Sequence, residues 1–386
     1  MKILIVNGHL HVGGVEKSLV SLLKSFDYSK NEVDLLLVED LGEYRAEIPE
    51  QVRVIYYDLK PTYGSVAGVF RKAWKERQWQ PIIEKLVLTV SNKMSKTILR
   101  FLDLPKALRQ EYDCAIAYRV GFPLDLVTYA VKAKKKMVWW HHGEFDYSDD
   151  LAEKWNRCFA RLDDILCVSD SSRKMLASHY PDLVKKMQVA PNIILLEDIK
   201  RRAEVSHPYA EVHGKRILVS VGRFSPEKHM TDTVNAMREL RRRGHEELIW
   251  YLVGDGAERE SIERKIKEYG LEDCMVLAGN QNNPYPYIHC ADLFVHPSWV
   301  ESQGIAVLEA MALEKPCVVV HSSGTDEFVR DGYNAMSADR SGESLADCIE
   351  KALLADWTQM VFNQRGTVKQ YGPKSVMPGI MQILGE

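Results

Sequence analysis

Short apolar runs alternate with helical patterns along most of the chain. The runs are rich in Val, Ile and Leu without strict polar alternation, which is typical of parallel strands covered on both faces. Those in the first half are Lys2–Val6, Glu32–Leu37, Cys114–Tyr118, Lys135–Trp140, Asp164–Val168 and Met187–Ala190. Those in the second half are Arg216–Val221, Leu248–Val253, Met275–Ala278, Leu293–His296 and Pro316–Val320.

Helical spacing of apolar residues recurs between these runs. It is found over Gly14–Ser25, Ser171–His179, Met230–Arg243, Glu258–Tyr269, Gly304–Leu313 and Gly342–Leu354. Recurrent strand–helix units predict an α/β protein with two Rossmann-like, doubly wound parallel sheets. The polar stretch Asn192–Gly214 separates the two series. We therefore expect one domain over residues 1–200, a second over 201–355 and a helical tail over 356–386.

Residues 60–110 break the alternation. They contain 11 basic residues against three acidic ones, interleaved with aromatic residues such as Phe70, Trp74 and Trp79. Apolar and basic residues on one helical stretch suit an anionic membrane surface. A solvated basic helix that covers the sheet explains the same pattern, so both interpretations remain open.

Composition excludes several protein classes. The 386 residues are 46% hydrophobic and 27% charged, which is typical of a globular chain of two to three domains. A net charge of −3 does not indicate a nucleic-acid partner. The seven cysteines show no CxxC or CxxxH spacing, so neither a disulfide framework nor a zinc ribbon is expected.

No signal peptide or membrane span is predicted. The N-terminal apolar run breaks off at Asn7, and the longest uncharged run, from Cys274 to Ala291, contains several Asn, Gln and Pro residues. Together with the cysteine usage, this predicts a cytoplasmic protein, at most peripheral on the inner face of the cell membrane.

The first candidate for ligand chemistry is the glycine pair Gly13-Gly14 after the first strand, followed by Glu16. Glycines between a strand and a helix let the backbone approach a ligand, and the helix N-terminus favours an anion. A plain strand-to-helix turn explains the pair equally well. Because the GxGxxG pattern is absent, a nicotinamide oxidoreductase is disfavoured.

The second candidate follows the first strand of the second half, in a loop that carries Gly222, Arg223 and Lys228. Ligands of open α/β sheets bind where such loops leave the carboxyl ends of the strands. A guanidinium and an ammonium form a reasonable clamp for a diphosphate. Either cation on its own is more often a solvated surface charge.

The third candidate lies around Gly304, where apolar spacing predicts that a helix begins. Glu301 falls in the loop before this helix and Glu309 one turn inside it. The free N–H groups of a helix start suit a phosphate, and carboxylates accept hydrogen bonds from sugar hydroxyls. The spacing favours a binding site over two unrelated acidic residues.

Taken together, these motifs resemble the retaining glycosyltransferases of the GT-B fold, specifically family 4. The resemblance covers nearly the whole chain and includes Gly13–Glu16, Gly222–Lys228, Val253–Gly256, Gly279–Gln281, Ala291–Ser298, the Glu301/Glu309 pair and Ala310–Pro316. It implies two Rossmann-like domains that face each other across a cleft, with the acceptor on the first domain and the donor on the second. It also implies that the tail over 356–386 crosses back to the first domain.

The resemblance assigns roles residue by residue. Arg223 and Lys228 would bind the donor diphosphate, Glu309 the ribose hydroxyls and Glu301 the donor sugar. The implied catalytic residues are His142, Arg223, Lys228 and Glu301. Further donor-binding positions would be Gly13, Gly14, Gly222, Gly254, Asn280, Gln281, Gln303, Gly304 and Ile305.

A histidine near the reacting sugar is also implied, and the chain offers two, His141 and His142. Similarity to members with the pattern Trp-x-His-Gly-Asp-Phe favours His142, which leaves His141 to face the core or the inter-domain seam. Glu16 and His142 would lie on the acceptor side.

The function implied is transfer of a sugar, with retention, from a nucleoside diphosphate sugar to an acceptor hydroxyl. A UDP-sugar is favoured because it is the commonest donor in such families. The acceptor would be a lipid-linked or cell-surface polysaccharide or teichoic acid, and no metal or other cofactor is expected. A non-catalytic sugar-nucleotide-binding subunit of a membrane glycan assembly complex remains an alternative, as does a GT-B epimerase or phosphorylase.

Overall fold

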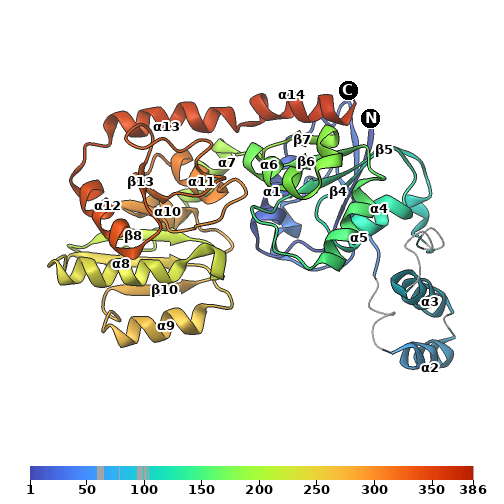
Figure 1. The fold of residues 1–386 in the computed structure, drawn as a ribbon, viewed down its shortest axis with the longest axis horizontal. Coiled ribbons are helices and arrows are strands. Elements are labelled where there is room, and N and C mark those ends of the chain that lie inside the picture. Colours follow the sequence, from blue (N-terminus) through green and yellow to red (C-terminus); the bar gives the residue numbers. More distant parts are fainter. Residues whose placement is uncertain (59–64, 78, 94–98, 100–101, 103, 386) are drawn as a thin grey trace.

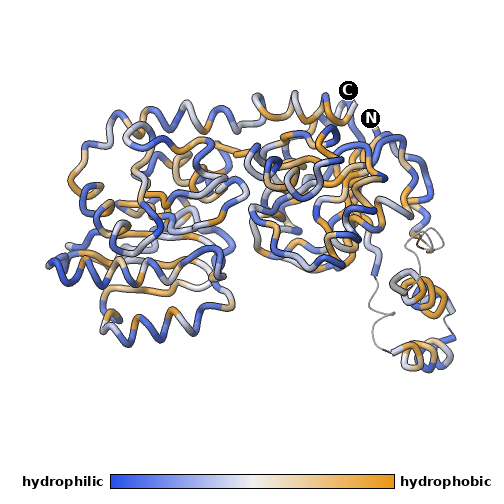
Figure 2. Tube along the Cα trace, in the orientation of Figure 1, coloured by the Kyte–Doolittle hydropathy of each residue, from blue (hydrophilic) through white to orange (hydrophobic). Residues whose placement is uncertain are grey.

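The computed structural model describes residues 1–58, 65–77, 79–93, 99, 102 and 104–385. These residues form two parallel sheets, one in each half of the chain (Figure 1). This arrangement confirms the predicted α/β class with two Rossmann-like domains. Figure 2 shows apolar residues concentrated along the strands and on the helix faces that cover them.

The N-terminal sheet has seven described strands in the order β3-β2-β1-β4-β5-β6-β7. Its strands are β1 (Lys2–Asn7), β2 (Glu32–Leu37), β3 (Arg53–Tyr56), β4 (Tyr112–Ala117), β5 (Ala133–Trp140), β6 (Asp164–Cys167) and β7 (Met187–Val189). The sequence pattern did not predict β3. It is an edge strand of four residues, too short to show a distinct hydrophobic run.

The C-terminal sheet has six described strands in the order β10-β9-β8-β11-β12-β13. Its strands are β8 (Arg216–Val221), β9 (Leu248–Val253), β10 (Met275–Gly279), β11 (Leu293–His296), β12 (Cys317–Val320) and β13 (Met336–Ala338). The pattern also missed β13, an edge strand of only three residues.

Helices connect the strands of both sheets. In the first half they are α1 (Gly14–Leu23), α2 (Val66–Glu76), α3 (Gln80–Lys93), α4 (Phe122–Tyr129), α5 (Asp149–Phe159) and α6 (Asp170–His179). In the second half they are α7 (Leu196–Ala203), α8 (Met230–Arg242), α9 (Arg259–Glu268), α10 (Tyr285–Cys290), α11 (Ile305–Ala312) and α12 (Gly342–Leu354).

Each sheet has a switch point where the chain order reverses. In the first sheet β1 lies between β2 and β4, and in the second β8 lies between β9 and β11. All of these pairs are parallel, so the carboxyl ends of neighbouring strands meet at one edge. Loops at this edge are the usual ligand-binding position in such sheets.

The chain crosses between the domains twice. After β7, Ile194 and Ile199 already pack in the core of the C-terminal domain, so the segment predicted as a polar boundary contains helix α7. At the other end, α13 (Thr358–Gln370) contributes Val368 to the same core. Helix α14 (Pro373–Leu384) packs Met377 and Ile380 on the N-terminal core.

Helices α2 and α3 project from the N-terminal domain (Figure 1), and α3 contacts its core through Val87 and Leu88. Helix α2 begins after Ser65, whose hydroxyl accepts a hydrogen bond from the Gly68 N–H at 3.1 Å, and it ends at Arg77 in a left-handed conformation. Several positions of the predicted basic segment lie outside the described residues, namely Lys60, Tyr63, Lys96, Arg100, Phe101 and Asp103. Within the described part of the chain, no helix has the length and apolar character needed to cross a membrane.

Candidate functional site

Two loops meet at the switch point of the C-terminal sheet. Strand β8 is followed by a short 3₁₀ turn, Pro226–Lys228, and the neighbouring strand β11 leads to Glu301. The Nζ atom of Lys228 lies 2.6 Å from Oε1 of Glu301. The structure thus brings together two predicted site residues that are 73 positions apart in the sequence.

The Glu301 carboxylate also receives a hydrogen bond from His296, with Nε2 2.8 Å from Oε1. Glu301 is buried, and burial alone would raise the pKa of its carboxyl. The Lys228 cation and the His296 hydrogen bond outweigh burial and hold this pKa below its usual range. Glu301 is therefore an ionised carboxylate in fixed contact with two partners.

Packing between the two loops keeps this pair in place. The backbone oxygen of Glu227 accepts hydrogen bonds from the Ser298 hydroxyl at 3.2 Å and from the Trp299 N–H at 3.3 Å. The His229 ring stacks on Trp299 with 3.6 Å between ring centroids. The loop after β8 therefore has little freedom to move away from the loop after β11.

Arg223 differs from Lys228 in its surroundings. Its side chain is exposed, and the guanidinium makes no hydrogen bond or ion pair with any other described residue. Its neighbour Gly222 donates its N–H to Val253 at 3.0 Å, and Gly254 donates to Gly279 at 2.9 Å. Arg223 is thus a cation on a firmly held loop that remains available for an anion.

Helix α11 begins beside these loops. Gly304 precedes it with φ = 80°, and a Cβ at this position would lie 2.5 Å from a Thr325 methyl group. Both features require glycine. The N–H groups of Ile305 and Ala306, the first two of the helix, donate to no described backbone oxygen and suit a phosphate.

The side chain of Gln303 is hydrogen-bonded to another segment of the chain. Its Oε1 accepts hydrogen bonds from the backbone N–H and the side-chain amide of Asn192, both at 2.8 Å. Asn192 lies in the first segment that crosses between the domains. The Gln303 side chain therefore fastens α11 to this crossing, and only its backbone remains for a ligand.

Glu309 lies one turn into α11 and is buried. Its Oε1 accepts a hydrogen bond from the Tyr285 hydroxyl at 3.0 Å and lies 2.5 Å from Nζ of Lys17. Lys17 belongs to α1 of the N-terminal domain, so this ion pair joins the two domains.

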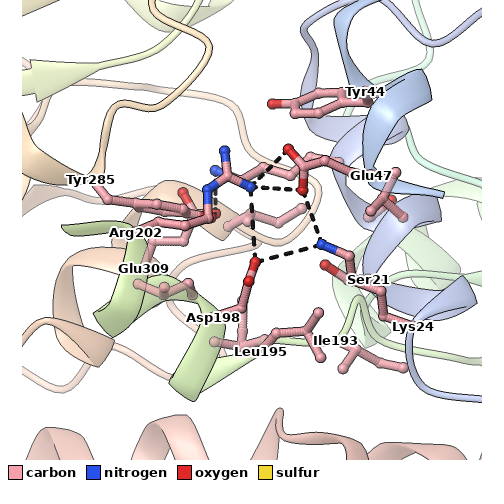
Figure 3. A pocket seen from close by; sticks show the side chains of 16 residues that line it. Ser21, Lys24, Tyr44, Glu47, Ile193, Leu195, Asp198, Arg202, Tyr285 and Glu309 are labelled. Atoms are coloured by element: carbon pink, nitrogen blue, oxygen red, sulfur yellow. Dashed lines mark hydrogen bonds and ion pairs between the residues drawn. The ribbon is translucent and has the colours of Figure 1, made fainter. Parts of the chain in front are cut away.

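Glu309 and Lys17 line a pocket between the domains (Figure 3). Charged side chains of the two domains form ion pairs with each other in this pocket. Arg202 of the C-terminal domain donates from Nη1 to both oxygens of Glu47 at 2.8 Å. Lys24 lies 3.0 Å from Glu47 and 3.7 Å from Asp198.

The N-terminal domain meets the Glu301 loop through the turn after β5. A Cβ at Gly143 would lie 2.7 Å from the backbone carbon of Glu301, so the two backbones are in direct contact. His142, the preceding residue, bonds through Nδ1 to the Tyr147 hydroxyl at 2.8 Å. The turn that carries His142 therefore contacts the backbone of the Glu301 loop from the opposite domain.

The two adjacent histidines have different surroundings. Burial and the Arg119 charge lower the pKa of His142 to about 4, so its imidazole is neutral near pH 7. His141 is packed against Tyr118 and Trp139 with centroid distances of 4.7 and 6.2 Å. Burial, followed by the charges of His142 and Arg119, lowers the pKa of His141 to about 3.

Glu16 lies on the N-terminal side, in the first turn of α1. It is buried, its Oε2 lies beside Gly13, and its Oε1 accepts a hydrogen bond from Arg119 at 2.9 Å. Gly14 is the first residue of α1. Glu16 is therefore already paired with a cation of its own domain.

Asn280 and Gln281 follow β10 and line a separate surface hollow with Asn282, Asn283 and Tyr287. Gln281 uses its amide to bond the Ala278 backbone oxygen at 2.8 Å. These two predicted base-site residues therefore do not line the pocket that contains Glu309. Among the residues with described positions, no group of three or more His, Cys, Asp or Glu is arranged to hold a metal ion.

Three residues that contact the predicted carboxylates were not predicted for the site. Lys17 and Tyr285 bond Glu309, and His296 bonds Glu301. His296 falls within a motif quoted for the family resemblance, which was the one available signal. Lys17 and Tyr285 lie in segments whose proximity only the folded chain establishes.

Comparison with known proteins agrees with this arrangement. Residues 202–373 match the family model described as Glycosyl transferases group 1. The chain is 31% identical over 157 residues to alpha-D-kanosaminyltransferase of Streptomyces kanamyceticus, covering 40% of each protein. Several curated relatives, including this one, are matched over less than half of their length.

A longer alignment exists with N-acetylgalactosamine-N,N'-diacetylbacillosaminyl-diphospho-undecaprenol 4-alpha-N-acetylgalactosaminyltransferase of Campylobacter jejuni. It has 25% identity over 324 residues and covers 83% of this chain and 80% of that protein. Among solved structures, Anabaena Alr3699/HepE in complex with UDP and glucose superposes with a TM-score of 0.73. That match has 19% identity and covers 100% of this chain and 99% of the other. The chain therefore has the GT-B fold, and its residues 202–373 are similar to the glycosyl transferases group 1 family.

Proposed function

We propose that this protein transfers a sugar from a UDP-sugar to a hydroxyl of a lipid-linked or cell-surface glycan, with retention of configuration. The observation that carries the proposal is the contact between Lys228 and Glu301 at the switch point, with Arg223 exposed on the same loop. The solved relative bound to UDP and glucose supports the donor. The Campylobacter relative, whose name includes a diphospho-undecaprenol, supports a lipid-linked acceptor.

The donor diphosphate binds between the Arg223–Lys228 loop and the start of α11. The exposed Arg223 guanidinium takes a phosphate directly, and Lys228 holds a second positive charge beside Glu301. Fixed cations and helix N–H groups stabilise the negative charge that develops on the leaving diphosphate. We propose that this set of groups replaces a metal ion.

The sugar lies between Glu301 and the turn that contains His142 and Gly143. Because the imidazole of His142 is neutral near pH 7, it can donate a hydrogen bond to a sugar hydroxyl without adding charge. Glu301 accepts a hydrogen bond from another hydroxyl. Glu309, next to the Tyr285 hydroxyl, accepts hydrogen bonds from the ribose.

The state of the carboxylates supports a front-face route. Glu301 is held by Lys228 and His296, and Glu16 is held by Arg119, so neither is a free nucleophile. In the front-face route the bond from the sugar C1 to the diphosphate oxygen breaks while the acceptor oxygen bonds to C1. The acceptor proton passes to the departing phosphate oxygen, so no enzyme base is consumed.

The proposed compartment is the cytoplasm. All seven cysteines are described and free, and six of them are buried, as expected for a protein that works in a reducing environment.

The decisive experiment measures UDP release from a panel of UDP-sugars with purified protein and membrane extract as the acceptor source. Release that depends on the acceptor, together with an α-linked product from an α-linked donor, is the expected result.

UDP binding without acceptor-dependent release would instead support a non-catalytic binding subunit. Consumption of the UDP-sugar without any glycosidic product would indicate an epimerase. Phosphate-dependent cleavage of a glycan would indicate a phosphorylase. Unchanged activity after treatment with a chelator is expected from the cationic donor site.

A further inference from the structure

Helices α2 and α3 expose apolar side chains on the surface, although other residues of the same helices are buried. Val69 and Ala73 of α2 and Ile82 of α3 are buried. A helix with one buried face normally has a polar outer face. Here, however, the large side chains of Phe70 and Trp74 are exposed, Trp74 to 64%.

The spacing aligns these exposed residues. On α2, Val66, Phe70 and Trp74 are four positions apart and so form one stripe. On α3, Ile83 and Leu86 are three positions apart and exposed. Figure 2 shows apolar residues on both helices, which project from the N-terminal domain.

Aromatic contacts join the two stripes. Phe70 and Trp74 stack with 6.3 Å between ring centroids, and Trp74 meets Trp79 edge-on at 5.3 Å. Trp79 immediately precedes α3. The apolar surfaces of the two helices therefore form one continuous patch, larger than the scattered single side chains of an ordinary surface.

Basic residues outnumber acidic ones on the exposed surface of α2, where Glu76 is the one exposed acidic residue. Arg71, Lys72, Lys75 and Arg77 are exposed on α2 and at its end. The acidic Glu84 is buried, and its carboxylate accepts a hydrogen bond from the Tyr57 hydroxyl at 3.1 Å. Residues 60–110 contain 11 of the chain's 51 basic residues but only three of its 54 acidic ones.

We infer that the patch on α2 and α3 docks the protein on an anionic lipid bilayer. Tryptophan is favoured at the membrane–water interface, and basic side chains are attracted to anionic headgroups. A second copy of the chain is a poor occupant, because it would bring like charges together. The inference goes beyond the proposed function, since docking requires no sugar nucleotide.

The test is co-sedimentation of the full-length protein with phosphatidylcholine vesicles, with and without phosphatidylglycerol. Binding is expected only to the anionic vesicles and should weaken as salt screens the charges. The double substitution Phe70→Ser and Trp74→Ser should lower the partition coefficient at least about tenfold. The matched control is Phe362→Ser, which changes an exposed aromatic residue of the C-terminal domain and should leave binding intact.

Charge is tested separately. Reversal of Lys72 and Lys75 to Glu should lower the partition coefficient at least about 25-fold, because each basic residue near the surface contributes roughly fivefold. Reversal of Arg264 and Lys267, an exposed pair on α9 with the same spacing, should have little effect. Thermal melts of each variant establish that the fold is retained.

Insertion of the patch has its own spectroscopic signature. Trp74 and Trp79 are exposed, whereas Trp139, Trp140, Trp155 and Trp250 are buried. Brominated lipid should therefore quench fluorescence in the native protein but much less in a Trp74→Phe/Trp79→Phe variant that still binds.

Equal binding to neutral vesicles, or no binding to either kind, would overturn the inference. So would a dimer in light scattering that Phe70→Ser abolishes, because the patch would then be a contact between copies of the chain. None of these outcomes depends on whether the protein transfers a sugar.

Discussion

Lys17 in the first helix of the N-terminal domain is paired with Glu309 in the C-terminal domain, with 2.5 Å between Nζ and Oε1. Both side chains are largely withdrawn from solvent, and the Tyr285 hydroxyl donates to the same oxygen. In the proposed function Glu309 accepts hydrogen bonds from the ribose. Lys17 and the nucleotide therefore compete for one carboxylate.

The substitution Lys17→Met should strengthen UDP binding about two- to tenfold, because the nucleotide would no longer have to displace the ammonium group. Isothermal titration with UDP measures the effect. Lys24→Met is the matched control, since Lys24 immediately follows the same helix but pairs with Glu47 and Asp198. Weaker UDP binding by Lys17→Met would show that the lysine helps to hold the nucleotide.

Arg223→Ala should lower turnover about 10²- to 10³-fold, comparable to the loss of one oxyanion donor. Stability should hardly change, because the side chain is exposed and bonds no other described residue. The control Arg264→Ala, in an exposed position on α9, should retain full turnover. Undiminished activity in Arg223→Ala would remove this residue from the diphosphate site.

Gly143→Ala tests the contact between the domains. The added Cβ would lie 2.7 Å from the Glu301 backbone, and this clash is relieved only if the two loops separate. Turnover should fall more than about tenfold through lost positioning of the sugar, while the melting temperature stays nearly constant. Gly8→Ala is the control, because no atom beyond its two chain neighbours lies within 4 Å of its Cβ position. Normal turnover in Gly143→Ala would mean that this contact is not needed for the reaction.

His141 should make stability depend on pH. Its pKa is lowered from 6.5 to about 3 in the folded protein, so the unfolded chain takes up a proton that the folded chain does not. Its contribution is complete above pH 6.5 and is lost as the pH falls below that value. One buried histidine of this kind accounts for about 2 kcal/mol between pH 7 and pH 5.

The variant His141→Phe preserves the stacking on Tyr118 and should flatten this dependence. Urea denaturation at the two pH values measures the difference in the free energy of unfolding. An unchanged slope in the variant would show that His141 does not titrate on unfolding.

Much of the fold was predictable because buried parallel strands are continuous apolar runs. The two missed strands, β3 and β13, have four and three residues and lie at sheet edges, where neither length nor pattern distinguishes them from loops. Helix α7 was missed because its exposed charged residues dominate a short segment in which Ile199 and Ala203 are buried.

The site was predictable only in part. The loops of Lys228 and Glu301 could be predicted as site candidates, because each carries charged residues close to a glycine within a few positions of sequence. The partner of Glu309 could not be found in this way, because Lys17 lies 292 positions earlier and contacts it only across two domains. Gln303 shows the converse case, a motif residue whose side chain instead bonds the crossing segment at Asn192.

The two segments that cross between the domains also touch each other, because the Ile194 N–H donates to the Tyr371 backbone oxygen at 2.8 Å. A single connecting segment would let one domain rotate freely relative to the other. Two connecting segments that are hydrogen-bonded to each other resist this rotation. Bending about the point where they meet is then the easier motion. Substrate would then enter, and product leave, when the two domains separate on the side opposite this hinge. Helix α14 would move with the N-terminal domain, on whose core it packs.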